Sequence, residues 1–233
     1  MMQHKTLFYR LITMLFPNIC SLCGEKCFNE EKLCLTCKHN LSLNNSRCQQ
    51  CALPIAKNNS ICGKCLNNKP YYDKTFAPYL YQSLISRLIL DLKFNQQLAN
   101  AVILGELLFL QIKKQNIICP DVLIPVPLHK KRLKQRGFNQ ALEIAKILSK
   151  KLNTPIDYQA CQRIKNTLPQ SEISAEERKK NIHQAFAISK KINYQHIAII
   201  DDVMTTGNTV NELAKALKKS GIKKISVWCI ARA

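Results

Sequence analysis

A short segment near the end of the chain constrains the fold most, because it joins a strand pattern to a helix pattern through a turn that suits an anion. Residues 197–200 are apolar and predict a buried strand, and residues 210–219 predict a helix. Asp201 and Asp202 follow the strand, and a turn of small residues leads into the helix. Backbone N–H groups and hydroxyls at a helix N-terminus favour a phosphate, and carboxylates accept hydrogen bonds from hydroxyls. The segment therefore predicts a site for a phosphorylated ligand that carries hydroxyl groups.

Strand and helix patterns alternate through residues 67–233. After an aromatic, strand-like stretch at 70–81, we expect strands at 121–124, 154–164, 197–200 and 225–230. Apolar periodicity predicts helices that begin near residues 84, 98, 142 and 210. A further helix is expected to begin at Ser174, whose spacing to Glu177 is that of a capping box. Alternating strands and helices are typical of an α/β domain with a mostly parallel sheet and right-handed crossovers.

A turn with two prolines follows the strand expected at 121–124. Pro125 and Pro127 restrict the backbone there, and open α/β sheets bind ligands at the carboxyl ends of central strands. Five cations then stand within the seven residues 130–136. On its own such a run is a solvated face, but beside a phosphate site we expect it to face the ligand or a nucleic acid. Residues 163–171 are polar without a period and predict an active-site loop.

The first 66 residues contain a cysteine repeat. Four Cys-x-x-Cys pairs begin 14 residues apart. Each pair can present two sulfurs to a tetrahedral ion, so eight cysteines suit two structural zinc ions, which would supply the folding energy of so short a segment. The expected ligands are Cys20, Cys23, Cys34, Cys37, Cys48, Cys51, Cys62 and Cys65. Because the intervals are equal, the pairs could combine in sequence or interleave, and a redox role is the less favoured alternative.

The other cysteines and the apolar segments bear on where the protein resides. We expect Cys27 to be a spare thiol, and Cys119, Cys161 and Cys229 to be core residues. Chelating cysteine pairs favour a reducing compartment, and the apolar run 101–110 is far shorter than the roughly 20 residues that span a bilayer. We therefore expect a cytoplasmic protein without a transmembrane segment. The apolar stretch 7–17 is expected to be a packed helix, although it could lie on a membrane or partner surface.

The chain is strongly basic. Its 233 residues include 35 Lys and Arg against 15 Asp and Glu, which gives a formal charge of +20. Zinc thiolate centres would reduce this charge without reversing it. A polyanion, either a nucleic acid or an anionic membrane surface, is therefore a natural partner. A merely soluble, lysine-rich surface explains the charge equally well.

Residues 197–209 match, at every position, the 5-phosphoribosyl-1-pyrophosphate (PRPP) motif of type I phosphoribosyltransferases: four apolar residues, Asp-Asp, two residues, Thr-Thr-Gly, one residue and Thr. The cysteine pairs, the Pro-Val-Pro turn and three further motifs accompany it in order along the chain. These motifs are Arg132-x-x-x-Arg136-Gly137-Phe138-Asn139-Gln140, Arg163-x-x-x-Thr167-x-x-Gln170, and Arg178-x-x-Asn181 with Phe186. Together they resemble the ComF family over nearly the whole chain.

The resemblance implies a zinc-binding module at residues 1–66 and a type I phosphoribosyltransferase domain at residues 67–233. It also implies a role in DNA uptake during natural transformation, the process called competence, with incoming single-stranded DNA handled in the cytoplasm. The implied partners are PRPP or a related phosphosugar, single-stranded DNA, and competence or DNA-uptake proteins at the inner membrane, to which the protein could be peripheral.

By the same resemblance, Asp201 and Asp202 are the catalytic acids and accept hydrogen bonds from the ribose hydroxyls. The loop that would enclose the 5′-phosphate comprises Thr205, Thr206, Gly207, Asn208 and Thr209. The backbone of Leu128 and His129 would hold the pyrophosphate together with Mg²⁺. Arg132 and Arg136 would add cations to the same site. The competing structural interpretation is an acidic turn that only caps a helix.

Three functions fit these residues. The first is a PRPP-binding DNA-uptake factor whose basic surface holds single-stranded DNA. The second is a conventional phosphoribosyltransferase that acts on a small base or amine, and the third is a PRPP sensor without turnover. The sequence shows no acceptor pocket, so binding is predicted whereas catalysis is left open. His129, His183 and His196 have no partner that suggests catalysis and are expected to be surface or loop residues.

Overall fold

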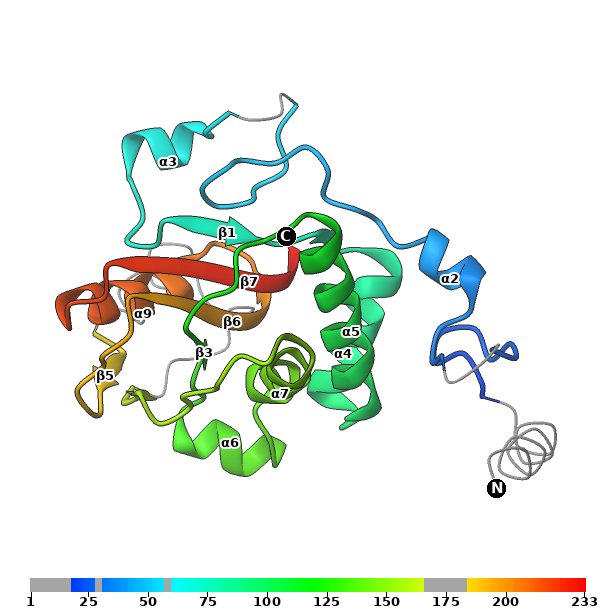
Figure 1. Cartoon of the computed structure of the whole chain (residues 1–233). Coiled ribbons are helices and arrows are strands. Elements are labelled where there is room, and N and C mark those ends of the chain that lie inside the picture. The colour runs from blue at the N-terminus through cyan, green and yellow to red at the C-terminus, as the bar shows by residue number, and fades with distance from the viewer. Residues whose placement is uncertain (1–17, 28–30, 57–59, 166–183) are drawn as a thin grey trace, which may run out of the picture.

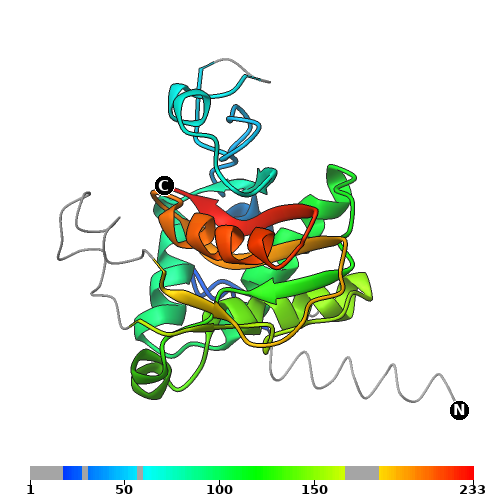
Figure 2. The same ribbon diagram turned by 90° about the vertical axis from the view of Figure 1, so that its left-hand side faces the viewer.

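The computed structural model describes residues 18–27, 31–56, 60–165 and 184–233. Several predictions lie outside these residues, namely the apolar stretch 7–17, the loop residues 166–171, and the helix expected from Ser174 with Arg178, Asn181 and His183. Figures 1 and 2 show a sheet at the centre of the molecule with helices on both of its faces.

The sheet is parallel throughout, as the alternation of strands and helices predicts. Its strands follow the order β1-β7-β6-β3, and β2 pairs with β7 beyond the end of β1. The strands are β1 (Lys74–Phe76), β2 (Tyr79–Leu80), β3 (Val122–Pro125), β6 (His196–Met204) and β7 (Lys224–Arg232). β6, which carries the acidic pair, therefore lies between two neighbours and is central.

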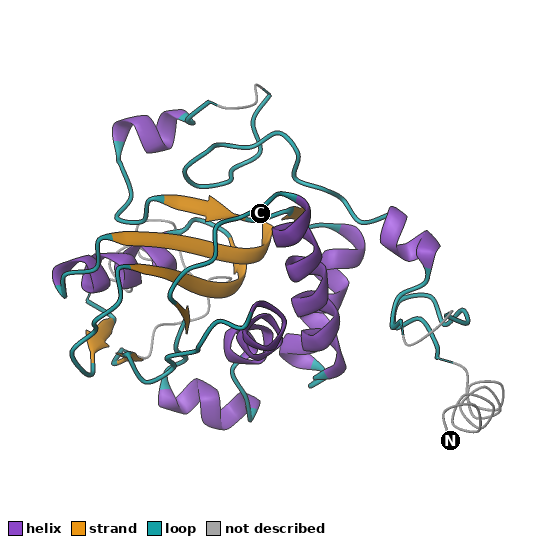
Figure 3. Ribbon diagram, in the orientation of Figure 1, coloured by secondary structure: helices purple, strands orange, loops and turns teal. Residues whose placement is uncertain are grey.

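The two faces of the sheet each bury a separate core, because successive side chains of a strand point to opposite faces. Ala198 and Ile200 of β6 face the helices α4 (Ser83–Phe94), α5 (Ala99–Lys114) and α7 (Gln140–Leu152). Ile197 and Ile199 face α9 (Asn208–Lys219). Figure 3 separates the strands by colour from the helices that cover them. Burial on both faces explains why residues 197–200 are apolar without alternation.

The helices form where the apolar periodicity predicts them, and one further helix, α6 (Lys130–Arg136), is present. In α9, the residues Val210, Leu213, Ala214 and Leu217 are buried at helical spacing. The basic run forms α6, none of whose residues is buried. Its charge run has no apolar stripe by which the sequence would indicate a helix. The helix ends at Gly137, whose φ of 80° is left-handed.

Three expectations need correction. The strand expected at 154–164 is reduced to β4 (Cys161–Arg163), which pairs antiparallel with β5 (Phe186–Ile188), and to one bridge between Ile156 and Leu123. Pro155 lacks an N–H for a ladder, which limits pairing there. β3 is consequently not central, since only that bridge lies beyond it in the described residues. Cys119 is exposed, whereas Cys161 and Cys229 are buried as expected.

The cysteine module contacts the rest of the chain at two places. Its first half, with α2 (Leu35–His39), packs against α4 and α5, and Arg87 Nη1 donates to the Leu22 carbonyl at 3.2 Å. Its second half, with α3 (Gly63–Asn67), joins the core on the α9 face and lies beside β1 in Figure 1. A division into domains between residues 66 and 67 remains our proposal. Within the described residues, no helix combines the length and apolarity needed to cross a bilayer.

Candidate functional site

The predicted site lies where β3 and β6 end side by side. Pro125 is paired with Ile200, and the backbone N–H of Val126 donates to the Ile200 carbonyl at 2.9 Å. Asn139 Nδ2 donates to the Val126 carbonyl at 3.0 Å, and Asn139 also caps α7. The Pro-Val-Pro turn, the acidic pair and the start of α7 are thus held together at one edge of the sheet.

The two carboxylates form a tight acidic pair with one cation. The backbone N–H of Asp202 donates to Asp201 Oδ1 at 2.9 Å, and Asp202 forms an ion pair with Lys93 of α4. Burial lowers the pKa of Lys93, but the Asp202 carboxylate outweighs burial and raises that pKa overall. Burial and the charge of Asp202 raise the pKa of Asp201 well above its ordinary value. Ionisation of Asp201 is therefore unfavourable, and hydroxyl donors or a cation beside the pair would make it easier.

Arg136 of α6 and Arg163 of β4 interact electrostatically with this pair. Burial and the neighbouring Arg132 lower the pKa of Arg136, while the charge of Asp202 opposes this shift. Arg163 shows the same balance, with Asp201 as its opposing carboxylate. Arg136 also lies over the ring of Phe94, with 5.6 Å from its Cζ atom to the ring centroid. The charges of Arg136 and Arg163 are therefore coupled to the acidic pair, whereas their contact with an anionic ligand stays a prediction.

The loop from Thr205 to Thr209 joins β6 to α9 and remains half-buried. Gly207 is the N-cap of α9, so Asn208 and Thr209 already form its first turn, and its φ of 80° is a conformation that favours glycine. A Cβ at Gly207 would lie 2.6 Å from Cε of Met204, so the backbone also passes close to a buried side chain. The backbone N–H of Asn208 donates to Thr206 Oγ1 at 3.4 Å. The loop brings hydroxyls and N–H groups to the N-terminus of a twelve-residue helix.

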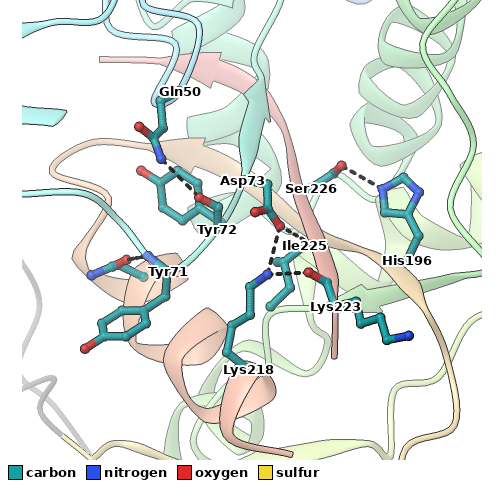
Figure 4. Close-up of polar contacts among 10 residues, drawn as sticks. Gln50, Tyr71, Tyr72, Asp73, His196, Lys218, Lys223, Ile225 and Ser226 are labelled. Carbon is teal, nitrogen blue, oxygen red and sulfur yellow. Dashed lines mark hydrogen bonds and ion pairs between the residues drawn. The ribbon is translucent and has the colours of Figure 1, made fainter. Parts of the chain in front are cut away.

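The two residues expected to hold pyrophosphate are half-buried beside this edge. His129 caps α6, and its Nδ1 atom accepts a hydrogen bond from the Lys131 backbone N–H at 3.3 Å. Leu128 precedes it in the loop after β3. Their contact with pyrophosphate stays a prediction. His196 lies at the opposite end of β6, where its Nε2 atom is 2.8 Å from Ser226 Oγ (Figure 4).

The eight paired cysteines form two groups in sequence order, which settles the pairing. One group is Cys20, Cys23, Cys34 and Cys37, and the other is Cys48, Cys51, Cys62 and Cys65. Within each group all the sulfur atoms lie within 4.8 Å of one another, and four thiolates around one zinc ion need sulfur separations of about 3.8 Å. The separations of 3.6 Å from Cys23 to Cys34 and from Cys51 to Cys62 agree with that requirement. Both groups therefore fit structural zinc.

Backbone donors prepare one sulfur in each group for a metal. Burial raises the pKa of Cys20, but backbone N–H groups outweigh burial and lower that pKa to about 6. The same competition lowers the pKa of Cys48 to about 7, and the Cys62 N–H lies 3.3 Å from Cys48 Sγ. A thiolate is the form that binds zinc. Cys27 is half-buried against the first group, outside both sets of ligands.

Lys93 is the residue of this site that the sequence analysis missed. Apolar periodicity predicted its helix, and no site residue was expected there. Ile85 and Ile89 precede Lys93 at intervals of four residues on the buried stripe of α4. A lysine that continues an apolar stripe must find an anionic partner, and this signal could have identified it.

Comparison with known proteins identifies the family of the chain. The double zinc ribbon domain family matches residues 11–66, and the phosphoribosyl transferase domain family matches residues 139–233. Competence protein F of Haemophilus influenzae is 36% identical over 176 residues, which are 72% of this chain and 77% of that protein. DNA utilization protein YhgH of Escherichia coli K12 is 33% identical over 218 residues, 92% of this chain and 90% of that protein. The chain belongs to the ComF family.

A more distant ComF relative is competence protein ComFC of Bacillus subtilis, which is 33% identical over 107 residues, 45% of this chain and 42% of that protein. Membership in the ComF family agrees with the observed architecture. The parallel sheet with its acidic strand end is a type I phosphoribosyltransferase-like fold, and the two four-cysteine groups form the double zinc ribbon. The expected fold class is thereby confirmed.

Proposed function

We propose that this ComF protein binds PRPP at the carboxyl end of β6. The proposal rests on the position of the acidic pair, which lies next to the loop at the N-terminus of α9. The acidic pair Asp201 and Asp202 is followed closely by the loop that caps α9, and its charge acts on Arg136 of α6 and Arg163 of β4. The acids would accept hydrogen bonds from the ribose hydroxyls, and the loop would donate to the 5′-phosphate.

Mg²⁺ suits this site as a companion of PRPP. Mg²⁺ prefers phosphate oxygens, water and few protein ligands, and it would neutralise the pyrophosphate. Burial and the neighbouring Asp202 raise the pKa of Asp201, so a cation close by would favour its charged form. Arg132 and Arg136 would bind the pyrophosphate oxygens, with the backbone of Leu128 and His129 beside them.

We further propose that the protein handles incoming single-stranded DNA during natural transformation. Two of its relatives are named for competence and a third for DNA utilization, and the formal charge of +20 favours a polyanion. The proposed setting is the cytoplasm, with competence or DNA-uptake proteins at the inner membrane as partners. In this function, PRPP or a related phosphosugar occupies the site whether or not it is turned over.

Thermal unfolding tests the phosphosugar half. PRPP with Mg²⁺ at about 100 times its Kd stabilises a protein by about 2.7 kcal/mol, and the melting temperature should rise accordingly. The double variant Asp201→Asn/Asp202→Asn should show no rise. The matched control is Glu106→Gln/Glu143→Gln, which removes two acids from surface ion pairs and should respond like the wild type. An equal rise in all three proteins would show that the acidic pair is not the site.

Salt titration tests the DNA half. Single-stranded DNA should bind with an affinity that falls as salt rises, with a logarithmic slope of about −0.7 for each phosphate contact. Lys131 and Lys134 are exposed on α6, so Lys131→Gln/Lys134→Gln should flatten the slope if this face holds the strand. Binding that ignores salt, or no binding, would remove DNA from the proposal while leaving PRPP in place.

The second candidate is a conventional transferase that acts on a small base or amine. Arg136, which interacts electrostatically with both Asp202 and Arg132, favours it, because departing pyrophosphate needs positive charge. Release of pyrophosphate from PRPP with one member of a base and amine panel, abolished by Asp202→Asn, would establish this activity. No release across the panel, with PRPP binding intact, would leave the binding function alone.

A further inference from the structure

The second cysteine group is connected to the phosphate loop by side chains from two directions. Lys64, between the ligands Cys62 and Cys65, donates from Nζ to the Thr206 carbonyl at 2.9 Å. Arg232, at the end of β7, donates from Nε to the carbonyl of Cys51 at 3.1 Å. These residues belong to neither the acidic pair nor the metal ligands. They lie between the second cysteine group and the phosphate loop.

Arg232 is the stronger of the two connections. Its Nη1 atom donates to the Met204 carbonyl at 2.9 Å and also to the Thr205 carbonyl, at the point where β6 becomes the loop. Arg232 as a whole is 4% exposed, so its guanidinium is held away from water. A guanidinium is a rigid planar fork. It therefore fixes the distance between the metal ligand Cys51 and the first peptides of the loop.

Tyr71 and Tyr72 add contacts between the same two regions. The carbonyl of Tyr72 accepts from Gln50 Nε2 at 3.4 Å (Figure 4), and Gln50 lies between two metal ligands. The Tyr72 hydroxyl is 3.5 Å from the position that a Cβ of Gly207 would take. The backbone N–H of Tyr71 donates to Asn211 Oδ1 in the first turn of α9 at 2.8 Å. Tyr71 and Tyr72 thus connect the second cysteine group to the phosphate loop and to the first turn of α9.

The first cysteine group has a different environment. Cys20 and Cys37 share a core with α4 and α5, and the groove beside this group is lined by residues of α5 such as Ile103 and Leu107. The two groups have the same ligand spacing but support different parts of the molecule. They therefore provide an internal comparison.

We propose that Arg232 and Lys64 are positioning residues, through which metal at the second cysteine group sets the shape of the phosphate loop. Metal at the first group has no such effect. Without metal, the four sulfurs of the second group lose their common ligand, and the Cys51 carbonyl and the Lys64 backbone lose their fixed positions. The peptides of Met204, Thr205 and Thr206 then lose donors to their carbonyls, and the N–H groups of the loop are no longer preorganised for a phosphate. That the phosphate belongs to PRPP rests on the proposed function, whereas the positioning of the loop is a property of the ligand-free protein.

Amide hydrogen exchange of the ligand-free protein tests the positioning directly. Cys62→Ser and Cys34→Ser are matched variants, because each removes the ligand that caps the short helix of its own group. Each variant should retain one zinc ion per chain. In Cys62→Ser, peptides that cover residues 203–210 should exchange about tenfold faster or more, the factor that corresponds to one lost charge-assisted hydrogen bond. In Cys34→Ser they should exchange as in the wild type. Unchanged exchange in Cys62→Ser, or equal acceleration in both variants, would overturn the proposal.

Lys64 provides a test that spares both metal groups. Lys64 is exposed, so Lys64→Met should leave the zinc content and the melting temperature unchanged while it accelerates exchange at residues 203–210. Lys64→Arg keeps a cationic donor for the Thr206 carbonyl and should restore slow exchange. If neither Lys64→Met nor Arg232→Lys changes the exchange of the loop, these side chains do not position it.

Calorimetric titration with PRPP and Mg²⁺ connects the positioning to ligand affinity. The Kd should rise about tenfold in Lys64→Met and in Cys62→Ser, and it should return toward the wild-type value in Lys64→Arg. A wild-type protein that does not bind PRPP would contradict the proposed function alone, because the exchange measurements use no ligand. A wild-type protein that binds PRPP, with the same Kd in Lys64→Met and Cys62→Ser, would contradict the positioning role alone.

Discussion

Lys93 of α4 and Asp202 of β6 form an ion pair at the end of the central strand, with 21% and 10% of their side chains exposed. The pair neutralises one of two adjacent carboxylates. Asp201 is left beside it with a raised pKa. Two adjacent carboxylates that share one cation are electrostatically unfavourable. If the pair binds a ligand as proposed, the arrangement that suits the ligand lowers the stability of the ligand-free protein.

Removal of Lys93 should destabilise the protein more than removal of a surface lysine. Lys93→Met leaves Asp202 buried without its cation beside a second carboxylate, and breaking such a pair from one side costs about 3 kcal/mol. Lys146→Met breaks the exposed pair with Glu143 and should cost no more than about 0.5 kcal/mol. Urea unfolding measures both free energies. The double variant Lys93→Met/Asp202→Asn should recover most of the loss, and an equal loss in single and double variants would refute the pairing energy.

Asp201→Asn should stabilise the ligand-free protein at neutral pH while it weakens ligand binding. The pKa of Asp201 is raised in the folded state above its ordinary 3.8. Between these two values the folded state binds more protons than the unfolded state, so the wild type loses stability as pH rises through this window. The asparagine variant lacks this loss. Its melting temperature should exceed that of the wild type by a margin that grows from about pH 4 to pH 7, and a constant margin would rule out titration of Asp201.

Asp121 provides a control, because its pKa is shifted in the opposite direction to that of Asp201. The backbone N–H groups of His196 and Gln195 each donate to its carboxylate at 2.9 Å and lower its pKa in the folded state. Its stabilising contribution is present above its unfolded pKa and is lost as pH falls through the lowered folded value. Asp121→Asn should therefore lower the melting temperature at neutral pH, with a difference that disappears in acid. The same melting series measures both variants.

The sheet and its covering helices could be predicted because they rest on periodicity. Residues 197–200 are uniformly apolar because both faces of β6 are covered, and α9 shows its buried stripe directly. The strand expected at 154–164 was wrong for most of its length because β propensity did not reveal the interruption at Pro155. The helix at 130–136 escaped prediction because none of its residues is buried, so no apolar period exists.

The site could be predicted only where its residues are contiguous. Asp201 to Thr209 form one motif, whereas Lys93, Lys64 and Arg232 come from distant segments and meet through tertiary packing. The pairing of the cysteines was open for a related reason. Equal intervals of 14 residues fit both sequential and interleaved groups, and only the separate anchoring of the two halves on different faces of the sheet distinguishes them.

Gly105→Ala should destabilise the protein although alanine is the better helix former. Gly105 lies in α5 where it crosses α7, and a Cβ there would lie 2.7 Å from Cβ of Ile147. That atom is fixed to the backbone of α7, so no rotamer change relieves the contact and the helices must separate. We expect a loss of about 1–2 kcal/mol, because overpacking outweighs a propensity gain of about 1 kcal/mol. Gly63→Ala, with open space around its Cβ, should show no loss in the same urea titration; a gain in Gly105→Ala would mean that the helices separate freely.

Gly207→Ala should damage the phosphate loop beyond the cost of its backbone conformation. Gly137 has the same φ of 80° with open space around its Cβ, so Gly137→Ala measures the left-handed conformation alone, about 1 kcal/mol. At Gly207 the added Cβ also meets Cε of Met204 at 2.6 Å, so this flexible side chain, in a residue that is 2% exposed, must shift within the core. The free energy of unfolding should therefore fall by about 2 kcal/mol, more than in Gly137→Ala. If PRPP binds as proposed, its stabilising effect should shrink in Gly207→Ala, because the displaced loop no longer presents its N–H groups together. Equal losses of stability in the two variants would show that Met204 yields without cost and that the close approach at Gly207 does not shape the loop.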